Sequence, residues 1–245
     1  MGGKRFPALA WAFLASLGSL APALQADTRA IDTPTAEALG HAYARWEIGA
    51  GPSGSVLSYF TVGIFERLHF GLSYGMQEVL GEGPIDANPI PGIQAQLLLL
   101  DTQGVPSLAF GFDSQGHGSW LEEADRYEYK SLGLYGVGSL HLAAQEWPLL
   151  TALSGGLNYS FEGSRSIDFF ANVVESIGSH FGLLGEYDFG LDDPDDANRG
   201  FLHAGVQWSF NGGSHVRFLL RDLLGNADED GKVGRELNFF YLFHL

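Results

Sequence analysis

The last ten residues of the chain, 236–245, read ELNFFYLFHL. Large apolar side chains occupy every second position and alternate with polar ones: Leu237, Phe239, Tyr241, Phe243 and Leu245 against Glu236, Asn238 and His244. Successive side chains of a β-strand point to opposite faces. The stretch therefore predicts a strand with one apolar and one polar face.

The same alternation recurs upstream along most of the chain. It is clearest in 67–77, 201–210 and 214–223, and less regular in 41–49, 54–65, 93–101, 106–113, 128–140, 150–161, 165–174 and 180–190. From Ala36 onward there is no helical periodicity and no run of 18 apolar residues. With 236–245, these segments predict about twelve strands.

The residues on the two faces decide what kind of β fold these strands build. The apolar face carries Leu, Phe, Tyr and Trp, whereas the opposite face is mostly Gly, Ser, Gln, Asn and scattered charge. A soluble sandwich would invert that usage, while a membrane barrel turns its large apolar face to lipid and keeps a polar or small lumen face. We therefore expect an all-β fold, an antiparallel transmembrane β-barrel of about twelve strands.

The connections between the expected strands alternate in length. Those after even-numbered strands are short, and those after odd-numbered strands are mostly longer and more acidic: 78–92, 114–127, 191–198 and 225–234. Two odd connections, 51–54 and 162–165, are short. Short periplasmic turns and longer outer loops are typical of bacterial outer-membrane barrels.

The first 26 residues have the pattern of a cleaved signal peptide. Lys4 and Arg5 precede the apolar run Phe6–Leu20, and small residues end the segment at Ala26. We expect 1–26 to be removed and 27–245 to form a single barrel domain in a bacterial outer membrane.

Composition excludes several classes of protein. The chain has 29 acidic and 13 basic residues, a formal net charge of −16, which argues against a nucleic-acid partner. It has no cysteine, so disulfides, thiolate nucleophiles and iron–sulfur clusters are excluded. With 45% hydrophobic and 13% aromatic residues, it is too apolar for a disordered acidic chain.

Several segments resemble known barrels. The residues 88–92 (NPIPG), 106–113 (PSLAFGFD), 156–160 (GLNYS) and 186–188 (EYD) resemble poorly characterised barrels that are distantly similar to exopolysaccharide-associated outer-membrane lipoproteins. The strand 236–245 resembles the insertion signal of Gram-negative barrels, which implies the barrel-assembly machinery as a partner. This chain departs from those patterns in ending on Leu245 instead of Phe and in lacking a lipidation cysteine.

The alternation also predicts which polar residues line the lumen: Arg45, Glu47, His69, Asp113, Asp168, Glu186, Asp188, His203, Arg217 and Arg221. Charges buried without partners would be costly, so they must either pair or line water. We expect Arg217 and Arg221 to pair with Glu186 and Asp188 across the lumen. Two alternatives are compatible with the sequence: a narrow hydrated lumen, and a closed barrel whose lumen is filled by such pairs.

Two motifs invite a chemical interpretation. The run 115–119 (QGHGS) offers His117 and Ser119, but it falls in an expected loop, and we interpret it as a glycine-rich tip with no catalytic role. The acidic runs 192–196 and 228–231 could hold a hard cation, yet they lack a full calcium-loop pattern, and we expect solvated loops. No catalytic residue, metal or cofactor is expected.

The sequence favours a small passive channel or an export-associated barrel that is not an enzyme. A lipid- or lipopolysaccharide-modifying enzyme and a purely structural closed barrel are the alternatives. The expected partners are outer-membrane lipids, lipopolysaccharide and a small polar solute, with no nucleic acid. No motif names the solute, and none gives the oligomeric state.

Overall fold

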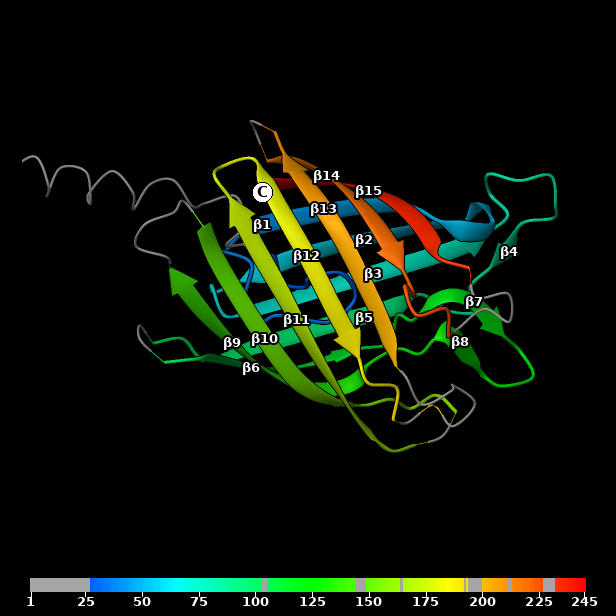
Figure 1. Cartoon of the computed structure of the whole chain (residues 1–245), viewed down its shortest axis with the longest axis horizontal. Coiled ribbons are helices and arrows are strands. Elements are labelled where there is room, and N and C mark those ends of the chain that lie inside the picture. The colour runs from blue at the N-terminus through cyan, green and yellow to red at the C-terminus, as the bar shows by residue number, and fades with distance from the viewer. Residues whose placement is uncertain are drawn as a thin grey trace, which may run out of the picture.

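The computed structural model describes residues 27–102, 105–143, 149–163, 165–191, 193, 200–210, 213–226 and 232–245. Twelve long strands close into one barrel (Figure 1). They are β1 (Tyr43–Ala50), β2 (Val56–Ile64), β3 (Leu68–Gln77), β5 (Gly92–Leu100), β6 (Ser107–Asp113), β9 (Gly133–Ala143), β10 (Leu149–Tyr159), β11 (Ile167–Ile177), β12 (Phe181–Asp188), β13 (Phe201–Ser209), β14 (Ser214–Arg221) and β15 (Gly234–His244). The predicted all-β barrel of twelve strands is confirmed.

The barrel closes because the first and last strands pair. β1 pairs with β15, where Tyr43 lies opposite His244. On its other side β1 pairs with β2, which in turn pairs with β3. Eleven of the twelve neighbouring pairs have an antiparallel register. At β9 and β10 the assigned register is a single parallel-type bridge between Gly133 and Tyr159. Closure leaves no unpaired edge among the twelve wall strands, and a sheet that spans a membrane must have no such edge.

Four short elements are not among these twelve strands. The 3-10 turn η1 (Pro52–Gly54) joins β1 to β2, and β4 (Asp86–Ala87) pairs with the end of β3. A hairpin of β7 (His117–Leu121) and β8 (Arg126–Tyr129) forms a sheet of its own. The prediction of one strand over 128–140 is therefore wrong, because β8 ends at Tyr129 and the wall resumes at Gly133, whose φ of 64° is in the left-handed region.

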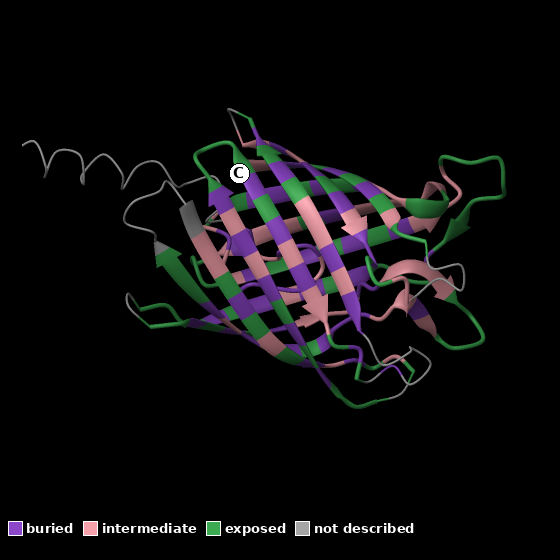
Figure 2. Cartoon of the chain, in the orientation of Figure 1, coloured by how far each residue is buried: buried purple, intermediate pink, exposed green. Residues whose placement is uncertain are grey.

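Burial alternates along the strands, as Figure 2 shows. On β11 the side chains of Asp168, Phe170 and Asn172 are buried, while Ile167 and Phe169 are 55% and 45% exposed. The exposed positions of the other strands are likewise large and apolar, including Trp208, Phe218 and Leu237. The barrel thus presents an apolar band outside and a polar face inside. Among the described residues, no helix has the length and apolar character needed to cross a membrane.

Residues 27–42 do not join the wall but run inside the barrel, and we call this segment the plug (Figure 1). The side chains of Ala30 and Leu39 are fully buried. The plug turns back on itself, since the Ala30 amide donates to the Thr33 carbonyl at 3.0 Å and the Thr35 amide to the Thr28 carbonyl at 3.0 Å. The signal peptide expected over 1–26 lies outside the described residues.

The two ends of the barrel differ. Tyr43 and His244 mark the turn end, near which the plug joins β1. The opposite end, which we call the loop end, carries η1, β4 and the β7–β8 hairpin (Figure 1). In an outer-membrane barrel the turn end is periplasmic and the loop end faces outward.

The apolar outer face makes a depth-dependent prediction. Phe218 lies near the middle of β14 and is 44% exposed, whereas Ile167 opens β11 at the loop end. We expect Phe218→Arg to lower the free energy of unfolding by about 2–4 kcal/mol and Ile167→Arg by no more than about 1 kcal/mol, because an arginine costs most at the bilayer midplane. Urea unfolding in phospholipid vesicles measures both, and equal losses would contradict a membrane-spanning wall.

Candidate functional site

All ten residues expected on the lumen face lie on the interior side of the barrel. Eight are buried, and Asp113 and Asp188 are half-buried and line an interior pocket. The contacts of these side chains differ from those that the sequence predicts. The plug occupies the lumen, and five of the ten form hydrogen bonds or ion pairs with it: Arg45, Glu47, Glu186, Arg217 and Arg221.

One cluster of charges surrounds Asp27 and Arg29, at the beginning of the plug. Asp27 pairs with Arg45 at 3.1 Å and with Arg217 at 2.8 Å. Glu47 pairs with Arg45 at 2.7 Å and with Arg29 of the plug at 2.9 Å. Three cations and two anions leave the cluster one charge positive. Each buried charge has an opposite partner, as burial requires.

The guanidinium groups of this cluster also pack on aromatic rings. The Arg29 guanidinium lies 3.6 Å from the centre of the Tyr59 ring, and the Arg45 guanidinium lies 4.0 Å from that of Phe240. Arg217 donates to the Ala30 carbonyl of the plug at 3.1 Å. The ring contacts hold the guanidinium groups of plug and wall in place, since a cation over a desolvated ring face is attracted by its quadrupole.

The tip of the plug holds a carboxylate of the wall. A single oxygen of Glu186, Oε2, accepts hydrogen bonds from the amides of Ile31, Asp32 and Thr33 at 3.1, 2.9 and 2.9 Å, and from the Thr33 hydroxyl at 2.8 Å. Successive backbone amides that converge in this way form an anion-binding nest. No sequence signal could have found this contact, because a nest needs a backbone conformation and no particular residue type.

A second charged cluster surrounds Asp32 at the tip of the plug. Arg221 binds both carboxylate oxygens of Asp32, with Nη2 to Oδ1 at 2.9 Å, and it also pairs with Glu236. His117 reaches Asp32 Oδ1 from the hairpin at 3.1 Å. One cation and two anions leave this cluster one charge negative. The plug tip is thus bound from β14 of the wall and from the β7–β8 hairpin.

His117 is a neutral ring in this cluster. Burial lowers the pKa of its imidazole to about 4, and nearby Arg221 acts in the same direction while Asp32 opposes it. Its Nδ1 lies 3.3 Å from Nη2 of Arg221, which can only donate, so Nε2 carries the hydrogen that faces Asp32 and the Tyr59 hydroxyl. The expectation that 115–119 forms a glycine-rich loop tip is wrong, because His117 begins β7 and faces the lumen.

The expected cross-lumen pairing of Arg217 and Arg221 with Glu186 and Asp188 is also wrong. Both arginines pair with aspartates of the plug, and Glu186 accepts from its tip. Asp188 instead accepts from the Gly190 amide at 3.1 Å. The physical reason is that the plug stands between the strands that carry these groups.

Neutral groups hold the rest of the plug. Gln96 donates to the carbonyls of Thr35 and Glu37 at 3.1 and 2.7 Å, and Asn172 donates to that of Pro34 at 3.0 Å. Small apolar contacts add to this, since Ala30 and Ile31 pack with Val174, Leu184 and Leu219 of the wall. The contacts that hold the plug in the lumen are therefore noncovalent and mostly polar.

Gly63 of β2 makes room for the plug. A Cβ atom at this position would overlap the backbone oxygens of Leu39 and Gly40, so any other residue would clash with the plug backbone. Gly136 of β9 has open space where its Cβ would lie. The two glycines form a matched pair for testing the seat of the plug.

The described residues contain one group with metal-ligand chemistry. Ligand atoms of Asp32, Glu186 and His203 lie within 4.8 Å of one another. However, Arg221 occupies both oxygens of Asp32, and His203 Nδ1 accepts from the Asp222 amide at 3.0 Å, so its Nε2 carries a hydrogen. The group fits a hydrogen-bonded cluster better than a cation site.

The other chemical motifs fare differently. The acidic runs 192–196 and 228–231 lie outside the described residues except for Asp193, which is buried and pairs with Arg126 at 2.6 Å. Within the described part of the chain, no serine hydroxyl contacts His117, whose partners are Asp32, Tyr59 and Arg221. The arrangement around His117 can hold a peptide segment, but His117 is not part of a nucleophile–base pair.

The closed wall of twelve strands and its apolar outer band define the class: the chain has the fold of a Gram-negative outer-membrane β-barrel. No known protein family matches the chain, and no curated protein matches it either. Among solved structures it is similar to the KdgM porin, at 12% identity over 82% of this chain and 99% of that chain, with a TM-score of 0.51. It is also similar to the COG4313 outer membrane channel from Pseudomonas putida F1, at 12% identity over 87% of this chain and 100% of that chain, with a TM-score of 0.47. At this identity the likeness concerns the fold.

The seating of the plug can be tested with a single thiol, because the chain has no cysteine. We expect Ala30→Cys, at a fully buried position, to resist a maleimide reagent in the folded barrel. Adding Gly63→Ala should expose the thiol, because the new methyl group displaces the plug backbone. Labelling is followed by mass spectrometry.

Gly136→Ala in the same Ala30→Cys background is the control and should leave the thiol protected. Rapid labelling of Ala30→Cys alone would show that residues 27–42 do not occupy the lumen.

Proposed function

We propose that the protein is a passive outer-membrane diffusion channel for small polar solutes, and that the plug closes it at rest. The observation that carries this proposal is the way the lumen is filled. A separate segment, residues 27–42, occupies it through noncovalent and mostly polar contacts. A barrel with a purely structural role could fill its lumen with side chains of its own wall.

The polarity of the inner wall supports the same function. Without the plug, the lumen would be lined by groups that water can solvate, among them Arg45, Glu47, Gln96, Asn172 and Glu186. Water can take over the hydrogen bonds that these groups now make to the plug. Displacement of the plug would therefore open a hydrated path instead of an apolar void.

The proposal includes the setting of the channel. The segment 1–26 would direct export, the barrel-assembly machinery would insert the wall, and outer-membrane lipids and lipopolysaccharide would contact the apolar band. The fold supports an outer-membrane location.

The alternatives have less support. A lipid- or lipopolysaccharide-modifying enzyme needs a nucleophile beside a base, and His117 is instead committed to holding Asp32 of the plug. A structural closed barrel is the stronger rival, and conductance distinguishes it from a channel.

The proposal predicts that weakening the tip of the plug increases conduction. Glu186→Ala removes the acceptor of four hydrogen bonds from the plug. One hydrogen bond to a charged group contributes about 1.5–3 kcal/mol, so we expect the open probability in planar bilayers to rise at least about tenfold. Arg217→Ala, which removes one of the two arginines paired with Asp27 and the hydrogen bond to the Ala30 carbonyl, should change it in the same direction.

Asp168→Ala is the matched control. Asp168 is a buried carboxylate of the inner wall that accepts from the Gly190 and Leu191 amides and has no hydrogen bond or ion pair to the plug. Its conductance should equal that of the unmodified chain. A chain that lacks residues 28–38, folds as a barrel and still conducts nothing would establish the structural barrel.

A further inference from the structure

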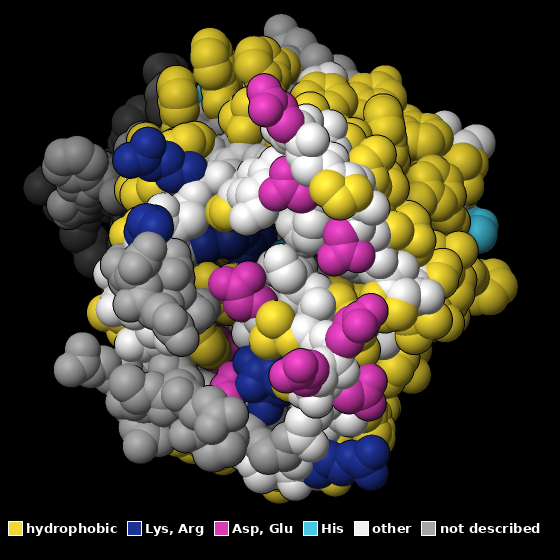
Figure 3. Space-filling view, turned by 90° about the vertical axis from the view of Figure 1, so that its right-hand side faces the viewer, with side chains coloured by type: hydrophobic (Ala, Val, Ile, Leu, Met, Phe, Trp, Pro, Cys, Tyr) yellow, Lys and Arg dark blue, Asp and Glu magenta, His cyan; other side chains and the backbone are white. Residues whose placement is uncertain are grey.

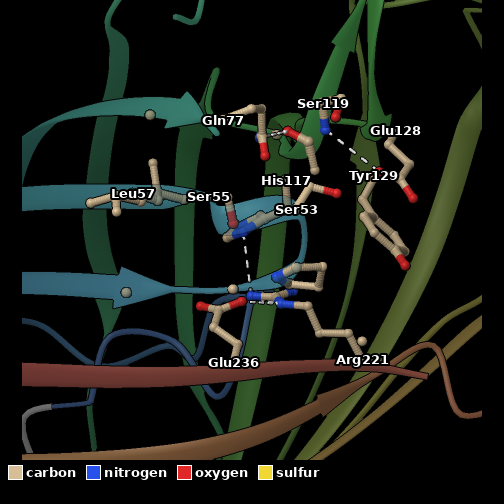
Figure 4. Close-up of a pocket in the computed structure, with 18 of the residues that line it drawn as sticks. Ser53, Ser55, Leu57, Gln77, His117, Ser119, Glu128, Tyr129, Arg221 and Glu236 are labelled. Atoms are coloured by element: carbon tan, nitrogen blue, oxygen red, sulfur yellow. Dashed lines mark hydrogen bonds and ion pairs between the residues drawn. The ribbon is translucent and has the colours of Figure 1, made fainter. Parts of the chain in front are cut away.

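A cavity of about 550 Å³ lies at the loop end of the barrel. Its walls come from η1, the ends of β2 and β3, the β7–β8 hairpin and the start of β15. His117 and Arg221 lie on it (Figure 4), and the same two residues hold Asp32 of the plug. Figure 3, a view onto this end, shows the surface hollowed there. The volume is in the range of small-molecule sites.

The cavity presents neutral hydrogen-bonding groups that the protein itself does not use. The hydroxyls of Ser53, Ser55 and Ser119 and the side-chain amide of Asn88 line it and have no hydrogen-bond partner among the described residues. Asn88 is 6% exposed, so its amide has little access to solvent outside the cavity. Polar groups that face a cavity and have no protein partner can hydrogen-bond to water or to a polar ligand inside it.

The wall also offers a flat apolar surface. The Tyr129 ring lines the cavity and is held edge-on against Phe201, with 5.2 Å between ring centres and 73° between planes. Aromatic rings combined with convergent polar groups bind ligands that have one apolar face and many hydroxyls.

The charges around the cavity disfavour anions. The cation of Arg221 is already balanced by Asp32 and Glu236, which leaves that cluster one charge negative. Acidic side chains gather on the described loops of this end, namely Glu78, Glu82, Asp86, Glu122, Glu123 and Asp125, and Figure 3 shows carboxylates around the hollow. The lining itself carries three cations, Arg221, Lys232 and Arg235, and two anions, Glu128 and Glu236. The excess of negative charge therefore lies on the loops at the mouth, where it would repel an anionic solute.

We propose that this cavity binds an uncharged polyhydroxylated solute, of about the size of a mono- or disaccharide, and discriminates against its anionic analogue. The inference deepens the proposed function by naming the class of solute, and it rests on that function only for its role in transport. Binding itself needs no open channel, because the cavity lies on the outer side of the seated plug.

Saturation-transfer difference NMR on the full barrel in detergent micelles tests the proposal with three probes that share one ring: glucose, glucuronate and glucosamine. We expect saturation transfer to glucose, and a dissociation constant for glucuronate at least about tenfold larger, because the carboxylates at the mouth oppose its approach. Glucosamine should bind at least as well as glucose. Maltose tests whether the cavity also takes two rings.

Two variants locate the binding. Ser119→Trp places a large side chain in the cavity and should abolish saturation transfer to glucose, while Ser179→Trp, at an exposed turn between β11 and β12, should leave it unchanged. Ser55→Ala is a milder second variant that removes one free hydroxyl with little change in volume and should weaken binding severalfold. Heat-modifiable migration on gels checks that each variant folds.

Three results would overturn the proposal: glucuronate binding as tightly as glucose, glucose binding that survives in folded Ser119→Trp, or no saturation transfer to any probe. These outcomes are separate from the test of the channel, because a barrel can bind glucose and still never conduct. Equally, a conducting barrel that binds none of the probes would retain the proposed function and refute this site.

Discussion

The pairing of buried charge inside the lumen is the constraint on which the rest of this structure depends. Lipid outside the wall requires apolar residues at alternate positions, and the strand period then assigns the remaining positions to the interior. There the wall places Arg45, Arg217 and Arg221 where they are nearly inaccessible to solvent. Such cations need anions close by. The plug supplies two of them, Asp27 and Asp32.

This constraint explains why a polar segment is stable inside a protein. The plug buries a few apolar side chains, namely Ala30, Ile31, Ala36 and Leu39, and it also carries charges complementary to the wall and backbone groups that the wall satisfies. Glu186 accepts hydrogen bonds from three amides and a hydroxyl at the tip, and Gln96 donates to the carbonyls of Thr35 and Glu37. Because most of the hold is polar, water can compete for it. That property suits a closure that must be reversible better than an apolar core would.

At the loop end, residues that bind the plug also line the cavity that is open to the exterior. Arg221 and His117 bind the plug on one side and line the outer cavity on the other, so one small cluster separates the space open to the exterior from the filled lumen (Figure 4). The β7–β8 hairpin, which carries His117, is not part of the barrel wall. The outer side of the plug is therefore bound partly by an element that is not part of the barrel wall.

The sequence by itself determined the wall. Alternation with a period of two is a local property, and the use of large residues on one face identifies lipid as the surroundings of that face. The twelve strands, the lumen-facing side of residues such as Arg45 and Glu186, and the class of fold therefore follow without coordinates. Tertiary structure alone decided the contents of the lumen. Residues 27–42 have no periodicity that marks them as an interior segment, and their contacts join positions as far apart as Thr33 and Glu186. A carboxylate that faces inward can pair with an arginine across the lumen or with backbone amides of an inserted loop, and the choice depends on which group fills the space.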